Sequence, residues 1–173
     1  MKRLFCITTV LAFCSPFFAQ TLSAPPMKMG LWEITTTSKI KLNLPPEVIA
    51  QLGGKSLPGM GPQTFVSQVC MTPETWRDAY TKSQKNNKDC QYTNLKQDAS
   101  GMSADVVCQS GKGTSTGHMQ LTFVSMERTQ GTMHMEMTDG KNPQPTIMDM
   151  TFDSVFKGED CKGLAPGAAK LVR

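Results

Sequence analysis

Seven runs of the chain alternate between apolar and polar side chains with a period of two. Three lie near the C-terminus, at residues 116–125, 129–138 and 146–156. Four precede them, at residues 29–44, 64–71, 90–96 and 102–108. Because successive side chains of a β-strand point to opposite faces, each run predicts a strand with one apolar face. The pattern therefore predicts about seven antiparallel strands.

The two C-terminal turns predict how the last three strands pair. Centring the first hairpin on Arg128 and the second between Asn142 and Pro143 puts the apolar residues on one common face. The expected cross-strand rows are Met119–Met137–Met148, Leu121–Met135–Met150 and Phe123–Met133–Phe152.

The same pairing predicts the positions of two histidines on the polar face. His118 falls opposite Thr138, four residues along the strand from His134. At about 3.3 Å per residue, the two imidazole rings would lie about 13 Å apart. We therefore expect that they do not share one metal ion.

Two short helices are predicted between the strands. Residues 46–52 form the first, ended by Gly53-Gly54, and residues 72–80 form the second, with Thr72 as N-cap and Pro73 in the first turn. The expected fold class is mainly β, an antiparallel meander forming a strongly curved sheet or partly open barrel, with one or two short helices. A sandwich of two sheets is the alternative.

The first 19 residues have the layout of a secretory signal peptide. Lys2 and Arg3 precede an apolar stretch that is too short to span a bilayer, and we expect cleavage after Ala19. No later segment is apolar for long enough to cross a membrane, so we expect a periplasmic or secreted protein. The remaining chain would consist of an N-terminal tail, one β domain and a C-terminal tail, at residues 20–28, 29–162 and 163–173.

Charge and composition exclude some classes of function. The 173-residue chain has 18 Lys and Arg and 14 Asp and Glu, and loss of Lys2 and Arg3 would leave a net charge of only +2. A chain so evenly balanced lacks the basic surface that a nucleic-acid backbone requires, so we expect no nucleic-acid partner. With 39% hydrophobic and 18% charged residues, the chain is globular rather than disordered.

Four cysteines remain once the signal peptide is removed: Cys70, Cys90, Cys108 and Cys161. An even number in an oxidising compartment predicts two disulfides. A hairpin centred on Ala99 sets Cys90 opposite Cys108, which favours a bridge between them and leaves Cys70–Cys161 to hold the C-terminal tail. The neighbouring pairs of that hairpin would be Tyr92–Val106 and Asn94–Ala104.

The sequence carries neither the phosphate-loop signature nor that of a zinc protease. A phosphate loop requires a glycine six positions before its lysine, and Val106 stands there relative to Lys112. H-E-x-x-H does not occur. Asp149 and Asp153 share the polar face of the last strand, where we interpret them as solubilising. We expect no catalytic residue, no cofactor and no enzymatic activity.

Methionine is the unusual feature of the composition, with 13 copies. On the shared apolar face the thioethers have three interpretations: a packed core, a pocket for an apolar small molecule, or a Cu(I) site. The copper site would use Met133, Met135 and Met137, which face one way along one strand. The pocket would be flanked by Trp32 and lined by Met119, Leu121, Phe123, Met133, Met135, Met137, Met148, Met150 and Phe152.

A series of short motifs resembles a known family in its order. The motifs are Met29-Gly30-Leu31-Trp32-Glu33-Ile34-Thr35, Val69-Cys70-Met71-Thr72-Pro73-Glu74, Cys90 and Cys108, Gly111-Lys112-Gly113-Thr114, Gly131-Thr132-Met133-His134-Met135-Glu136-Met137 and Gly158-Glu159-Asp160-Cys161. The chain thus resembles the bacterial exported family catalogued as domain of unknown function (DUF) 3617. The resemblance implies a small periplasmic protein and supplies no activity or site residues.

These observations together favour a non-enzymatic periplasmic β-protein that binds an apolar small molecule or an envelope protein. The alternative is a copper-handling protein that binds Cu(I) through its methionine face.

Overall fold

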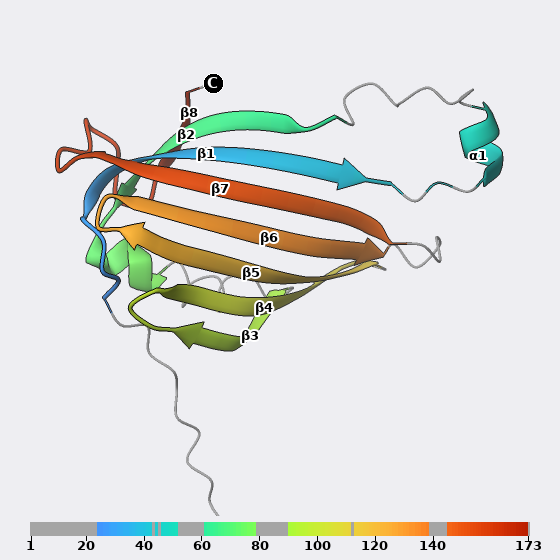
Figure 1. The fold of residues 1–173 in the computed structure, drawn as a ribbon, viewed down its shortest axis with the longest axis horizontal. Helices are drawn as coiled ribbons and strands as arrows, with labels where there is room; N and C mark the ends of the chain where they lie inside the picture. The colour runs from blue at the N-terminus through green and yellow to red at the C-terminus, as the bar shows by residue number, and fades with distance from the viewer. Residues whose placement is uncertain are drawn as a thin grey trace, which may run out of the picture.

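Eight β-strands pair into one antiparallel sheet, in the order β3-β4-β5-β6-β7-β1-β2-β8 (Figure 1). The computed structural model describes residues 24–42, 44, 46–51, 61–78, 90–111, 113–138 and 145–172. The strands are β1 (Gly30–Lys41), β2 (Gln63–Met71), β3 (Cys90–Gln97), β4 (Gly101–Ser110), β5 (Gly113–Ser125), β6 (Arg128–Thr138), β7 (Thr146–Gly158) and β8 (Ala169–Leu171). The expected signal peptide at residues 1–19 and the turn expected at residues 139–143 lie outside the described residues.

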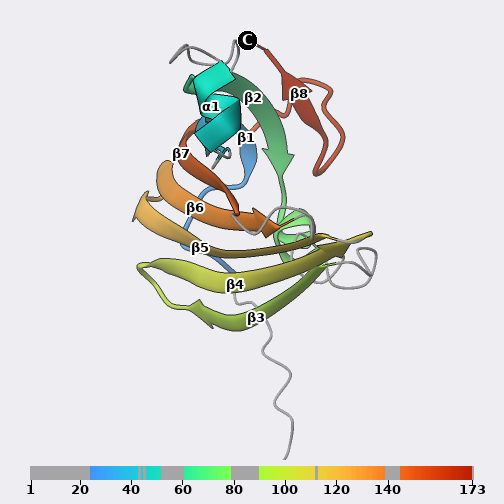
Figure 2. The same cartoon turned by 90° about the vertical axis from the view of Figure 1, so that its right-hand side faces the viewer.

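The predicted mainly β, antiparallel fold class is confirmed, and the sheet is strongly bent but open (Figure 2). Because all eight described strands belong to one sheet, the alternative of a two-sheet sandwich is wrong. Strands β3 to β7 form a meander, whereas β1 lies between β7 and β2. The C-terminal segment, expected to be a tail, adds β8 as an edge strand by pairing Ser67 with Leu171.

Both expected helices are present. Helix α1 covers Pro46–Gln51, and residues 73–78 form the second helix. Thr72 caps this second helix as predicted, because the Thr75 amide donates to Thr72 Oγ1 at 3.2 Å and the Thr72 amide donates to Thr75 Oγ1 at 2.7 Å. The helix lies on the inside of the bend, where it places Trp76 against the sheet (Figure 2).

The buried core lies at one end of the strands, where Met27, Trp32, Trp76 and Phe123 form a cluster. The ring centroids of Trp76 and Phe123 are 6.0 Å apart, and those of Trp32 and Phe156 are 5.8 Å apart. The Trp32 indole is only 1% exposed and donates from Nε1 to the Lys28 carbonyl oxygen at 2.9 Å. This end of the sheet is therefore closed by aromatic packing.

Both predicted disulfides are present. Cys70 is joined to Cys161, with 5.3 Å between their Cα atoms, and Cys90 is joined to Cys108. The predicted pair Tyr92–Val106 is also confirmed.

The predicted pair Asn94–Ala104 is wrong, because the register of β3 shifts between Thr93 and Lys96. Asn94 adopts a positive φ of 51° and leaves the ladder. Its side-chain amide instead donates to Asp105 Oδ2 at 2.7 Å. An extra residue in one strand of a hairpin produces this kind of bulge, which the apolar pattern does not encode.

The predicted registers of the two C-terminal hairpins are also wrong. Hairpin β5–β6 turns at Met126-Glu127 rather than around Arg128, so Met119 lies opposite Met133 instead of Met137. In hairpin β6–β7, the centre expected between Asn142 and Pro143 predicted the pairs Met137–Met148, Met135–Met150 and Met133–Phe152. The observed pairs are Met135–Met148, Met133–Met150 and Gly131–Phe152.

Backbone contacts explain the position of the first of these turns. The Met126 carbonyl oxygen accepts from the Lys28 amide at 2.8 Å, and the Glu127 carbonyl oxygen accepts from the Phe156 amide at 2.9 Å. Lys28 Nζ also lies 2.5 Å from Glu127 Oε1. The turn is therefore bonded to the N-terminal segment and to β7, and these tertiary contacts select a register that local sequence leaves open.

The two disulfides are expected to stabilise the fold unequally. They close loops with sequence separations of 91 and 18 residues. In the chain-entropy description, loss of Cys70–Cys161 costs about 4.6 kcal/mol and loss of Cys90–Cys108 about 3.2 kcal/mol. Urea unfolding of the two double Cys→Ser variants should therefore show the larger loss for Cys70/Cys161. An equal loss, or a larger one for Cys90/Cys108, would contradict this expectation.

Candidate functional site

The inner face of the bent sheet carries the predicted methionine cluster. Two adjacent cross-strand rows contain five thioethers, Met119–Met133–Met150 and Met135–Met148. The neighbouring row is Leu121–Gly131–Phe152. The predicted common face is therefore correct although the predicted rows are not. The pairing differs from the predicted one by four residues in β5–β6 and by two in β6–β7, and any even shift preserves the face on which a side chain lies. We refer to these eight residues as the methionine face.

The remaining predicted lining residues lie at the two ends of this face. Phe123 is only 9% exposed and, together with Trp32, belongs to the packed core. Trp32 therefore does not flank an open pocket as the sequence suggested. Met137 lies at the other end, opposite Ser115 and Thr146. Between these ends, the side chains of the methionine face are half-buried.

Two glycines help to shape the methionine face. A Cβ atom at Gly117 would lie 2.9 Å from Met135 Cγ, and one at Gly131 would lie 3.3 Å from Leu121 Cδ1 and 3.4 Å from Phe152 Cδ2. Neighbouring side chains therefore lean over both backbone positions. Interior strand glycines often mark such a close approach, a signal that the alternating pattern alone does not provide.

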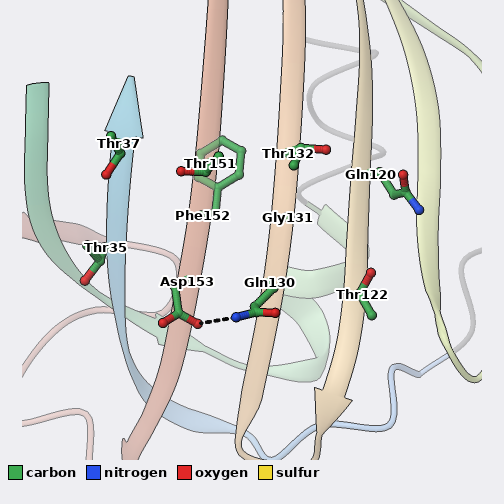
Figure 3. Close-up of a pocket in the computed structure, with 10 residues that line it drawn as sticks. All are labelled: Thr35, Thr37, Gln120, Thr122, Gln130, Gly131, Thr132, Thr151, Phe152 and Asp153. Atoms are coloured by element: carbon green, nitrogen blue, oxygen red, sulfur yellow. Dashed lines mark hydrogen bonds between the residues drawn. The ribbon is translucent and has the colours of Figure 1, made fainter. Parts of the chain in front are cut away.

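The opposite face of the sheet holds a pocket that sequence reasoning missed (Figure 3). Its volume is about 470 Å³, and two cross-strand rows of polar residues form most of its lining, with Gly131 and Phe152 between them. The rows are Gln120–Thr132–Thr151–Thr37 and Thr122–Gln130–Asp153–Thr35. Hydroxyl and amide groups give this pocket hydrogen-bonding capacity and little apolar character.

Asp153 is the charged group of this polar pocket. Its carboxylate accepts from Arg128 Nε at 3.0 Å and from Arg128 Nη2 at 3.1 Å, and Gln130 Nε2 lies 3.5 Å away. The bidentate hydrogen bonds from Arg128 lower the pKa of Asp153. The carboxylate is therefore ionised and held in place, beyond the solubilising role that the sequence suggested.

The next row of the same polar face brings together the two histidines that we expected to be far apart. His118 lies directly opposite His134, with Asp105 beyond His118 on β4 and Asp149 beyond His134 on β7. The expected separation of about 13 Å is therefore wrong, because it followed from the displaced turn. The row Asp105–His118–His134–Asp149 is called the histidine row below.

Each histidine in this row is hydrogen-bonded to the aspartate next to it. The Nδ1 atom of His118 lies 2.6 Å from Asp105 Oδ1, and the Nδ1 atom of His134 lies 2.6 Å from Asp149 Oδ1. The hydrogen bond to Asp149 raises the pKa of His134, and nearby Glu136 raises it further. The pKa of Asp105 is lowered by its hydrogen bonds with His118 and Asn94.

The raised pKa of His134 can be tested by titration. Asp149→Asn should lower the midpoint of the His134 ring-proton titration in NMR spectra, because the charge that favours the imidazolium is removed. Since the folded pKa exceeds the unfolded value, the pair stabilises the fold below the unfolded pKa, and this stabilisation disappears as the pH rises through the folded pKa. Thr151→Asn, on the same face of β7, is the control and should leave the midpoint unchanged. An unchanged midpoint in Asp149→Asn would refute the assigned cause.

Other features of the described residues bear on cofactors and membranes. No group of three or more His, Cys, Asp or Glu side chains in this part of the chain could hold a metal ion. None of the helices formed by the described residues has the length and apolar character needed to span a bilayer.

Comparison with known proteins gives a family match. The model of a family described as protein of unknown function (DUF3617) matches residues 27–161, a range that includes β1 to β7 and both disulfides. No curated protein and no solved structure matches the chain.

Proposed function

The chain belongs to the DUF3617 family, and because that description assigns no activity, we propose from the geometry that the protein binds an apolar ligand on its methionine face. The ligand class that we propose is a long acyl chain. The observation that carries the proposal is the continuous, half-buried row of thioether, Leu and Phe side chains on the inside of a bent sheet. We propose a binding role, without catalysis.

The physical properties of this face favour an apolar ligand. Large apolar surfaces that remain partly exposed on soluble proteins commonly mark binding sites. Methionine is unbranched and polarizable, so its side chain adapts to ligands of different shape. The bend of the sheet supports the concave form that small-molecule sites require (Figure 2).

Trp76 supports a ligand with a polar end. The indole is buried, and its Nε1 atom has no hydrogen-bond partner among the described residues. Trp76 packs against Phe123, two residues along β5 from Leu121 of the methionine face. A carboxylate or ester oxygen at one end of an acyl chain would accept this hydrogen bond, which otherwise stays unmade at a cost in free energy.

We also propose that the protein acts outside the cytoplasm, in the periplasm. The layout of residues 1–19 supports export. The two disulfides support an oxidising compartment, because such bonds persist there and are rare in the cytosol. An envelope location would give the methionine face access to lipids.

A charge on the methionine face should weaken ligand binding. Met133→Glu should weaken the binding of the fluorescent fatty acid cis-parinaric acid by at least about tenfold, because contact with an acyl chain desolvates the carboxylate. The matched control is Thr132→Glu, which adds the same charge to the opposite face of β6. Met150→Glu, in the same row on β7, provides a second test.

Two results would contradict the apolar-ligand proposal. One is wild-type protein that fails to bind cis-parinaric acid. The other is an equal affinity of Met133→Glu and Thr132→Glu while both proteins keep the wild-type circular dichroism spectrum. Native mass spectrometry of protein exported through its own signal sequence should, in addition, detect a bound lipid.

A second candidate function is Cu(I) binding, and it is favoured by the row Met119–Met133–Met150. These three thioethers come from three neighbouring strands, and each strand lies about 4.8 Å from the next. The trio suggested by the sequence, Met133, Met135 and Met137, instead extends about 13 Å along one strand. Soft sulfur ligands suit Cu(I), so the cross-strand row is the better candidate.

Met133→Leu separates the two candidate functions. Leucine preserves the apolar volume but removes the sulfur, so the affinity for cis-parinaric acid should change by less than about threefold. If the row binds copper, an anaerobic Cu(I) titration against a chelator should lose one equivalent in Met133→Leu. The number of Cu(I) equivalents bound should be unchanged in Met126→Leu, which alters an exposed methionine of the β5–β6 turn. Equal titrations of the wild type and Met133→Leu would exclude this copper site.

A further inference from the structure

We propose that His118 and His134 form a surface site for a divalent transition-metal ion, bound by one imidazole nitrogen from each ring. The site lies on the polar face, opposite the methionine face, and is independent of the function proposed above. Its ligands are nitrogen atoms rather than thioethers, so the ion class is Cu²⁺, Ni²⁺ or Zn²⁺.

Direct cross-strand opposition brings the two rings within reach of one ion. His118 of β5 pairs with His134 of β6, and the Cβ atoms of directly opposed residues lie about 4.5–5.5 Å apart. Metal–imidazole bonds of about 2.0–2.1 Å can bridge such a pair. The His118 and His134 side chains are 56% and 51% exposed, so an ion reaches them from solvent.

The two aspartates prepare the nitrogen atoms for a metal ion. Asp105 and Asp149 engage Nδ1 of each ring from the strands on either side of the pair. A neutral imidazole that donates from Nδ1 to a carboxylate carries its free lone pair on Nε2. Because Nε2 lies on the ring edge away from Nδ1, both lone pairs are directed away from the flanking aspartates. Such carboxylate–histidine pairs are characteristic of metal-ligating imidazoles.

The charges around the pair favour a cation. Asp105, Asp149 and Glu136 surround the two rings on the same face, and Glu136 Oε1 lies 3.6 Å from His134 Nε2. Lys39, opposite Asp149 in β1, is the basic residue at that end of the row. Three carboxylates beside the two rings attract a divalent ion. Protons compete with the metal for the same nitrogen atoms, so binding weakens as the pH falls.

The proposed site has two protein ligands and leaves its other coordination positions to water. This is consistent with the absence of any group of three or more metal-ligating side chains in the described parts of the chain. An open two-imidazole site imposes little geometric selection, so its affinities should follow the Irving–Williams order, with Cu²⁺ bound more tightly than Ni²⁺ or Zn²⁺.

The site can be tested on untagged, disulfide-bonded protein at about pH 8, where protons compete with the metal ion less than they do at neutral pH. Isothermal titration with Cu²⁺ should show one equivalent bound, and His118→Gln and His134→Gln should each weaken binding by at least about tenfold. Electron paramagnetic resonance of the Cu²⁺ complex should show two coordinated imidazole nitrogens in the wild type and one in each variant. Asp149→Asn, which changes a positioning residue, should weaken binding less than His134→Gln and retain both nitrogens.

A matched control moves one histidine without changing the number of histidines. In the double variant Thr132→His/His134→Gln the second ring lies two residues further along β6, opposite Gln120 instead of His118. Diagonal neighbours of this kind are about 7–8 Å apart, so tight binding should be lost. The proposal is overturned if this variant or His118→Gln binds Cu²⁺ within about twofold of the wild type, or if the wild-type spectrum shows a single nitrogen.

Discussion

The cross-strand register of β5, β6 and β7 is the constraint on which both faces of this sheet depend. It is set where the Met126-Glu127 turn is bonded to Lys28 and Phe156. With the turn in this place, thioethers from adjacent strands share rows on the inner face, and His118 meets His134 on the outer face. A displacement of two residues in either hairpin would keep every side chain on its face but dissolve these rows.

The two faces of these strands have separate chemistry. On the inner face, aromatic packing around Trp32 and Trp76 closes one end, and the half-buried methionine face extends from it. On the outer face, hydroxyl, amide and ionisable groups form successive rows, with Asp153 bound by Arg128. Because side chains alternate along each strand, a substitution on one face leaves the other face nearly intact. The proposed ligand binding and the proposed metal binding can therefore be tested separately.

The sequence predicted β1 to β7, both disulfides and the common apolar face, because period-two alternation and the opposition of Cys90 and Cys108 record these features directly. It did not predict β8, which lies in the segment expected to be a tail. It did not predict the rows, because alternation is unchanged by a two-residue shift and Met126-Glu127 carries no turn-forming Gly or Asn. The bulge at Asn94 and the insertion of β1 between β7 and β2 depend on tertiary contacts. The histidine pair was missed for the first of these reasons, since its separation was calculated from the displaced hairpin.

Cross-strand nuclear Overhauser effects measured on isotope-labelled protein test the register most directly. Backbone protons of opposed residues in an antiparallel pair lie close enough to give strong signals. The account predicts such signals between His118 and His134 and between Met119 and Met133. Strong signals between His118 and Thr138 and between Met119 and Met137 would instead contradict it, and the rows on both faces would be lost.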